Sequence, residues 1–389
     1  MWCIKVRQFK ARLGTMLGLG SLLVASMVMP RFCRAQPSRE QARFAQQLEQ
    51  HILSCARPSG SANIVRFVEH PQGAGLRFYF VSVGLFPLAD NPRFRNEVEG
   101  YLNWCLSLAH RDDRTWNDLS NINPIDERRS DADDSNAAMF IRLAVRYGSS
   151  RQGARWWRQN ESQVISIAQE VLLENQQTES GLVTTHSSSR LRGVDQQDPG
   201  LLATTSSSYL MDNCEVYSAL KMLAEKLARD NHADADEFAK AATHVASGID
   251  SLFNADAGAF YILDTQKTAI PNFYPEDELD FYPHRAAQIF PELFDVPLGD
   301  EEETRMKYDQ AWAFATANGD WAQGPITDEE FPWTVRALIA AKRGDHQTAT
   351  RILAWYQADM TGKHMYIHEM AMALQALESL KTTRDHQAR

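Results

Sequence analysis

Two stretches of this sequence each join an acidic loop to an apolar helix. Residues 130–138 read Ser-Asp-Ala-Asp-Asp-Ser-Asn-Ala-Ala, and residues 209–217 read Tyr-Leu-Met-Asp-Asn-Cys-Glu-Val-Tyr. A helix N-terminus favours carboxylates, but one of them is enough to cap it. If the two helix starts face each other, they bring several carboxylates together. A pair of carboxylates is the minimal equipment for acid/base cleavage of a glycosidic bond.

The first stretch crowds three carboxylates, those of Asp131, Asp133 and Asp134, into four residues. Mutual repulsion raises the pKa of at least one of them, which is what a general acid requires. Asp134 is nearest the apolar body of the helix and is our first catalytic candidate. We expect Asp131 to bind the substrate. The competing interpretation is that Asp133 or Asp134 simply caps the helix.

The second stretch places Asp212 and Glu215 three residues apart, so the two side chains share one face of a helix. We take both as catalytic candidates, and Tyr217 adds a phenol that we expect near the same mouth. The alternative is again structural, because Asp-X-X-Glu is close to a capping box.

Outward from these stretches, apolar residues recur with helical spacing and indicate about eleven helices. Strand signal is sparse: β-branched and aromatic residues in 63–68 and 76–83 flank His-Pro-Gln-Gly-Ala-Gly and predict a β-hairpin. The expected helices are residues 38–56, 93–109, 134–147, 155–176, 209–230, 234–254, 284–293, 301–317, 329–343, 346–360 and 364–381.

Long loops between these helices hold further candidates, because loops of this length in a compact domain usually carry function. The loops are 110–133, 177–208, 255–283 and 318–328. Tyr282 and Trp321 offer aromatic rings on which a sugar can stack, with Asp320 and His186 as polar neighbours. For each aromatic residue, packing onto the domain is the competing interpretation, and the Ser/Thr-rich parts of 177–208 also fit a disordered linker.

The N-terminus has the pattern of a signal peptide. Basic residues up to Arg12 precede an apolar run over 13–29, and small residues before Gln36 suit a signal peptidase. We therefore expect an exported, periplasmic or extracellular protein that begins at Gln36. An uncleaved anchor is the alternative, although about 17 apolar residues is short for a membrane span.

Composition narrows the partners. Loss of the six basic residues of segment 1–35 leaves 34 basic against 50 acidic residues, a formal charge of −16. Nucleic acid and an anionic membrane surface are therefore disfavoured as partners, and we expect no membrane association after cleavage.

The sequence does not define an oligomeric state. The sequence after the signal peptide has three cysteines, Cys55, Cys105 and Cys214. We expect either a Cys55–Cys105 disulfide or three buried thiols.

The usual signatures of other enzyme classes are missing from the sequence. It has no Gly-rich phosphate loop, dinucleotide fingerprint or Gly-X-Ser-X-Gly elbow. His364 and His368 lack the Glu of a His-Glu-X-X-His site. We therefore expect no cofactor and no metal.

Taken together, these features resemble the six-hairpin glycosidase superfamily, whose members form an (α/α)6 toroid. The resemblance rests on residues 131–147, 209–223, 254–261 and 281–294, and it covers roughly 93 to 381. Members are typically bacterial hydrolases, with fewer lyases, and their catalytic carboxylates lie at helix starts that line the toroid mouth. By this resemblance Asp134 and Asp212 match best, followed by Glu215. Asp-Ala-Asp-Asp also matches the acid motif of class II terpene cyclases, but the signal peptide and the lack of repeated Gln-Trp motifs argue against that class.

We therefore expect an all-α fold in which residues 93–381 form an (α/α)6 toroid of antiparallel hairpins. Residues 36–92 would add a helix and a small β-hairpin outside it, and 382–389 a tail, all in one domain after the signal peptide. The expected function is hydrolysis of a bacterial polysaccharide or oligosaccharide. Glycan binding without catalysis, or a lyase using Tyr217 or His186 as base, is the alternative.

Overall fold

The structure is a computed structural model. It describes residues 39–61, 63–109, 114–128, 130–186, 207–264, 281–317, 321, 331–360 and 364–387, with side chains to residue 381. All of these residues belong to one compact unit, Gln36–Arg389.

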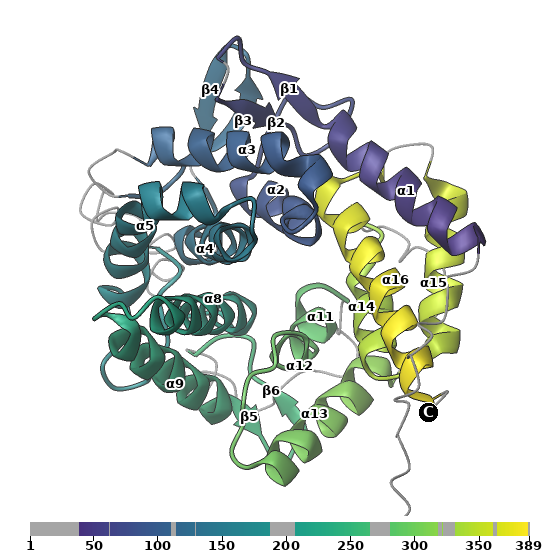
Figure 1. The fold of residues 1–389 in the computed structure, drawn as a ribbon. Coiled ribbons are helices and arrows are strands. Elements are labelled where there is room, and N and C mark those ends of the chain that lie inside the picture. Colours follow the sequence, from purple (N-terminus) through teal and green to yellow (C-terminus); the bar gives the residue numbers. More distant parts are fainter. Residues whose placement is uncertain are drawn as a thin grey trace, which may run out of the picture. The chain divides into compact units, whose positions relative to one another are not determined.

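Helices of this unit form two concentric rings (Figure 1). Each inner helix contacts the next inner helix, and the last of them contacts the first, which closes the ring. The inner elements are α2 (Phe78–Leu85), α4 (Asp133–Ser149), α8 (Leu210–Arg229), α11 (Ala286–Gln288) with α12 (Phe290–Leu293), α14 (Val335–Lys342) and α16 (Ile367–Gln387). The outer elements are α3 (Arg95–Leu108), α5 (Ala154–Ile167), α9 (Ala235–Ser251), α13 (Glu301–Thr316), α15 (His346–Asp359) and α1 (Arg39–Ser54). The predicted (α/α)6 toroid is confirmed.

Strands are confined to short antiparallel pairs within the described residues. They are β1 (Ala56–Pro58) with β2 (Val65–Phe67), β3 (Asp118–Ile122) with β4 (Ile125–Arg128), and β5 (Phe253–Asn254) with β6 (Ala259–Phe260).

The predicted hairpin between 63–68 and 76–83 is wrong. Residues 65–67 pair with 56–58, and the second segment is helix α2. Its sequence Phe-Tyr-Phe-Val-Ser-Val-Gly-Leu is almost entirely buried, and a short apolar run without alternation does not distinguish a buried helix from a buried strand.

Residues 36–92 are also not an addition outside the toroid. Helix α2 contacts α4 and α16 and is an inner helix, while α1 contacts α16 from the outer ring. Gly84 allows α2 and α16 to pack closely, because a Cβ at this position would lie 2.4 Å from Cγ1 of Ile367. The first and last helices of the ring therefore close it together.

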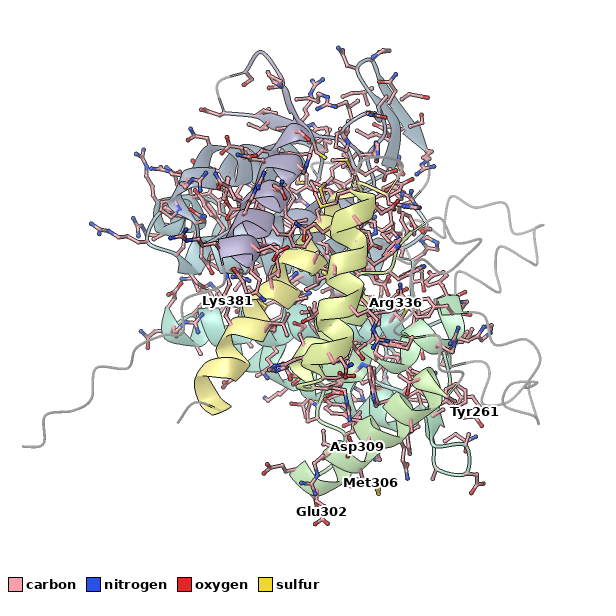
Figure 2. The ribbon with its side chains drawn as sticks, turned by 90° about the vertical axis from the view of Figure 1, so that its right-hand side faces the viewer. Tyr261, Glu302, Met306, Asp309, Arg336 and Lys381 are labelled. Atoms are coloured by element: carbon pink, nitrogen blue, oxygen red, sulfur yellow. The ribbon has the colours of Figure 1, made fainter. Side chains whose placement is uncertain are left out.

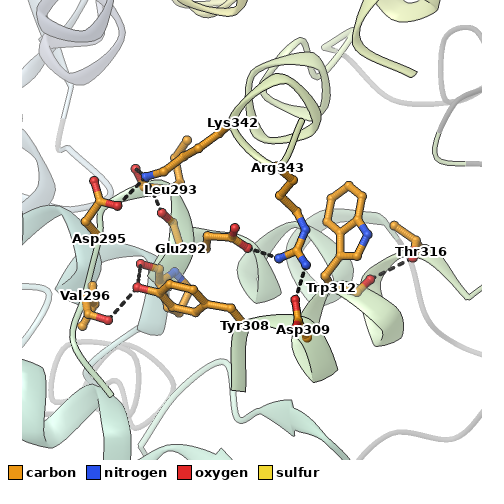
Figure 3. A network of polar contacts seen from close by, with 11 residues as sticks. Glu292, Leu293, Asp295, Val296, Tyr308, Asp309, Trp312, Thr316, Lys342 and Arg343 are labelled. Atoms are coloured by element: carbon orange, nitrogen blue, oxygen red, sulfur yellow. Dashed lines mark hydrogen bonds and ion pairs between the residues drawn. The ribbon is translucent and has the colours of Figure 1, made fainter. Parts of the chain in front are cut away.

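A network of charged side chains links α12, α13 and the end of α14 (Figure 3). Arg343 binds both Glu292 and Asp309, and Lys342 donates to the Asp295 carboxylate over 2.7 Å. Figure 2 shows Met306 on the outer side of α13, where it is 47% exposed, whereas Arg336 on α14 is buried.

The three cysteines after residue 36 are free and buried, so the interpretation as three buried thiols is confirmed. Burial raises the pKa of the Cys55 thiol to about 12. Within the described part of the chain, no helix is both long and apolar enough to cross a bilayer.

Candidate active site

The N-terminal turns of the inner helices meet around one cavity of about 390 Å³. Each of α2, α4, α8, α12, α14 and α16 contributes a lining residue from its first turns. This arrangement follows from the toroid, in which all inner helices run in the same direction. Its polar and aromatic lining residues include Tyr79, Phe80, Asp131, Ser135, Asp212, Glu215, Tyr282, Phe331, Trp333, His368 and Glu369.

Glu215 lies at the centre of the polar side of the cavity. The hydroxyl of Tyr79 donates to its Oε1 over 2.6 Å, and the hydroxyl of Ser135 donates to its Oε2 over 2.7 Å. Burial and the neighbouring Asp212 raise the pKa of Glu215 to about 8, although these two hydrogen bonds act in the opposite direction. Glu215 therefore keeps its proton at neutral pH.

Asp212 lines the cavity one helical turn before Glu215, so the predicted shared face is confirmed. Burial raises its pKa to about 7, with a smaller contribution from the charge of Asp131. Asp131 is exposed and lines the same cavity from the loop before α4. Four carboxyl groups therefore line the cavity: Asp131, Asp212 and Glu215 from the starts of α4 and α8, and Glu369 from the start of α16. Of these four, Asp131 is exposed.

Asp134, the first catalytic candidate from the sequence, does not line the cavity. Its side chain has no exposed surface, and its Oδ1 accepts the N–H of Ser135 over 2.8 Å. Its Oδ2 has no hydrogen-bond partner among the described residues. Burial, together with the charge of Asp212, raises its pKa well above the ordinary range. Asp134 is therefore a buried proton-holding group behind Asp212, out of reach of a ligand in the cavity.

Neither helix has a carboxylate at its N-cap position. The N-caps of α4 and α8 are Ala132 and Tyr209, and neither makes a side-chain cap hydrogen bond. Asp133 instead accepts from the hydroxyl of Ser130 and lies 3.2 Å from Nδ1 of His186. The interpretation of Asp133, Asp134 or Asp212 as an N-cap residue is therefore wrong, although Asp134 accepts one N–H within the first turn of α4.

Several other predicted site residues lie elsewhere. His186 is buried against Asp133 and does not line the cavity. Tyr217 borders a separate surface hollow with Lys221, because a residue two positions after Glu215 points to another side of the helix. Trp321 is buried against Phe281 and Trp312. Asp320 lies outside the described residues. Of the predicted binding residues, Asp131 and Tyr282 do line the cavity.

The cavity is also lined by aromatic residues, of which Tyr282 was predicted and Phe80, Phe331 and Trp333 were not. Phe80 stacks on His368 with ring centroids 3.9 Å apart, and Tyr282 stacks on Trp333 at 4.9 Å. Tyr79 was missed because its segment was assigned to a strand. Trp333 and Glu369 belong to no recognisable sequence motif. The aromatic residues in 331–333, directly before a helix, could nevertheless have been predicted to line the cavity.

The described residues contain no group of three or more His, Cys, Asp or Glu side chains that could hold a metal ion. What they form is a cavity lined by both carboxyl groups and aromatic rings. Such a cavity can hydrogen-bond the rim of a sugar, stack on its apolar face and transfer a proton.

Comparison with known proteins identifies the fold. No protein-family model matches the chain, and no curated protein matches it. Among solved structures, a β-1,3-1,4-glucanase from a Paenibacillus species matches with a TM-score of 0.61 and 9% identity, over 88% of this chain and 92% of the glucanase. A mannosylglycerate hydrolase from Thermus thermophilus, in complex with Tris, matches with a TM-score of 0.55 and 11% identity, over 85% of this chain and 99% of the hydrolase.

A reducing-end xylose-releasing exo-oligoxylanase also matches, with a TM-score of 0.53 and 13% identity, over 88% of this chain and 92% of the other. At such identities the likeness establishes the fold. The chain has the fold of the six-hairpin glycosidases.

Proposed function

We propose that this protein is a glycoside hydrolase that acts on a bacterial polysaccharide or oligosaccharide. The observation that supports this proposal best is the pairing of Asp212, whose pKa is raised to about 7, with the exposed Asp131 in one aromatic-lined cavity. A carboxyl group that keeps its proton near neutral pH can act as the acid, and an ionised carboxylate in contact with water can act as the base.

In this proposal Asp212 gives its proton to the glycosidic oxygen. Asp131 lies at the open side of the cavity, where it takes a proton from the attacking water. Glu215, with its pKa raised to about 8, stays protonated while Asp212 titrates, so it does not add a second negative charge beside the acid. Asp134 supports Asp212 from behind and does not touch the substrate.

A glycan panel tests the proposal. The protein is incubated with neutral and uronate-containing glycans, while reducing ends, ultraviolet absorbance and binding are recorded in parallel, with Asp212→Asn as the blank. A hydrolase releases reducing ends without new absorbance. Absorbing product would identify a lyase, and affinity without product would identify a binding protein; either result would overturn the proposal.

We also propose that the protein is exported. The basic start, the apolar run over 13–29 and the small residues before Gln36 support this. Expression of the full chain followed by N-terminal sequencing of the secreted material tests it, and the expected first residue is Gln36. Retention of the intact N-terminus in a membrane fraction would contradict it.

A further inference from the structure

Among the described aromatic residues that line the cavity, Tyr282 is the exposed one. Tyr282 is 46% exposed, although it lines the cavity. Trp333 stacks on it with ring centroids 4.9 Å apart and an interplanar angle of 19°. Two stacked rings cover only one face of each other, so Trp333 leaves the second face of the exposed Tyr282 ring uncovered by this stack.

The same ring lies beside the carboxyl groups. Partial burial, followed by the charges of Asp212, Asp131 and Glu215, raises the pKa of the Tyr282 hydroxyl to about 12. The phenol therefore stays protonated at any working pH and can donate a hydrogen bond. A sugar that stacks on Tyr282 is thereby placed next to Asp212.

Trp333, which supports Tyr282, has an unusual backbone conformation. Its φ is +53°, in the left-handed region that bulky residues rarely adopt. Such conformations cost free energy and persist only where the surrounding structure holds them, often at ligand sites. The backbone at Trp333 therefore requires a specific restraint.

Glu369 supplies this restraint from the first turn of α16. Its Oε1 accepts the N–H of Trp333 over 3.1 Å, and its Oε2 accepts the N–H and the hydroxyl of Thr334, each over 2.6 Å. Burial alone would raise the pKa of Glu369, but the interactions with His368 and Thr334 outweigh it and lower the pKa. Glu369 is thus an ionised carboxylate whose two oxygens fix the backbone of Trp333 and Thr334.

We infer that Tyr282 is the sugar-stacking surface of the cavity, that Trp333 is its support, and that Glu369 is the positioning residue that holds Trp333. The ligand class is a pyranose ring with an apolar face, bound next to Asp212. The choice of a sugar as the ligand rests on the proposed function, whereas the arrangement of Tyr282, Trp333 and Glu369 does not. Glu369 acts through Trp333 and is not assigned a role in proton transfer.

Trp321 provides a matched comparison. The ring centroid of Phe281 lies 5.5 Å from that of Trp321 and 5.4 Å from that of Trp333. Trp321 is buried and does not line the cavity, whereas Trp333 does. The two tryptophans therefore share a packing neighbour and differ in access to the ligand.

The test measures oligosaccharide binding by calorimetry, KM and kcat, and the melting temperature for four variants. Trp333→Ala should weaken binding and raise KM by about 3–10-fold, the amount expected for a lost aromatic contact, with little change in kcat. Trp333→Phe should largely restore binding, since it keeps a ring against Tyr282. Glu369→Gln should reproduce the binding loss of Trp333→Ala, because an amide cannot accept all of these hydrogen bonds. Trp321→Phe should leave binding unchanged.

The outcomes separate this inference from the proposed function. If the wild type binds a glycan without cleaving it, and Trp333→Ala weakens this binding, the hydrolase proposal is overturned and the stacking surface is supported. Cleavage with wild-type binding in both Trp333→Ala and Glu369→Gln would overturn the stacking surface alone. A wild-type protein that binds no glycan would overturn both.

Discussion

The hydroxyl of Tyr79 donates a 2.6 Å hydrogen bond to Oε1 of Glu215, across 136 residues of sequence. Tyr79 belongs to α2 and Glu215 to α8, while Ser135 on α4 donates to the other carboxyl oxygen over 2.7 Å. Three neighbouring inner helices therefore meet at a single carboxyl group. Their packing fixes the position of Glu215 and, one turn earlier, that of Asp212.

Replacing Tyr79 by Phe removes one donor to Glu215. Because this hydrogen bond lowers the pKa of Glu215, the pKa should rise further above about 8 in the variant. The free energy of unfolding should fall by about 1–2 kcal/mol. Carbon NMR titration of the Glu215 carboxyl, assigned with Glu215→Gln, measures the shift.

Tyr356→Phe is the control for this change. Tyr356 is also buried, and its hydroxyl donates to the carbonyl of His364 over 3.3 Å, away from Glu215. It should reduce stability without moving the titration of Glu215. An unchanged Glu215 titration in Tyr79→Phe would contradict the hydrogen-bond network.

The pH dependence of stability should change when Asp212 becomes Asn. Folding raises the pKa of Asp212 from 3.8 to about 7, so the folded state binds the proton more tightly than the unfolded state. This contribution to stability is fully present below about pH 4 and is lost as the pH rises to about 7. An amide does not titrate, so the variant should gain about 1–3 kcal/mol relative to wild type between pH 4 and pH 8.

Chemical denaturation at several pH values measures this gain. Asp309→Asn is a control, because Asp309 is bound to Arg343 and does not line the cavity. A constant difference between wild type and Asp212→Asn from pH 4 to pH 8 would show that Asp212 has no raised pKa.

Closure of the ring should depend on the absence of a side chain at Gly84. Gly84→Ala should lower the free energy of unfolding by about 1–3 kcal/mol, because the new methyl group overlaps Ile367. In the double variant with Ile367→Ala, the effect of the added methyl group should shrink, giving a favourable coupling energy in a double-mutant cycle. Strict additivity would contradict close packing of α2 on α16 at this point.

Much of the fold could be predicted from the sequence, because outer helices such as α1, α5 and α9 are long and amphipathic. The acidic stretches also lie at the end of the ring where the cavity is, and the three-residue spacing of Asp212 and Glu215 predicted the face that lines it. Helix α2 was missed because a short, mostly apolar and mostly buried segment carries no helical pattern. With α2 assigned to a strand, its Tyr79 could not be placed in the site.

Side-chain burial explains the remaining errors. Asp134 and Asp131 belong to the same acidic run, yet one is buried and the other exposed, and only packing against α8 decides which of them reaches the cavity. Trp321 and Trp333 are both near Phe281, and the sequence does not show which ring supports Tyr282. Glu369 acts through backbone N–H groups, which leave no mark in the sequence.

The most direct test of the central claim compares the rates of Asp212→Asn and Asp134→Asn on the glycan that the wild type hydrolyses, with melting temperatures measured alongside. Asp212→Asn should lose about 10²–10⁴-fold in kcat while remaining folded, as expected for a missing general acid. Asp134→Asn should stay within about tenfold of wild type, since Asp134 does not line the cavity. A folded Asp212→Asn with wild-type kcat, or a larger loss in Asp134→Asn, would contradict the assignment of Asp212 as the acid.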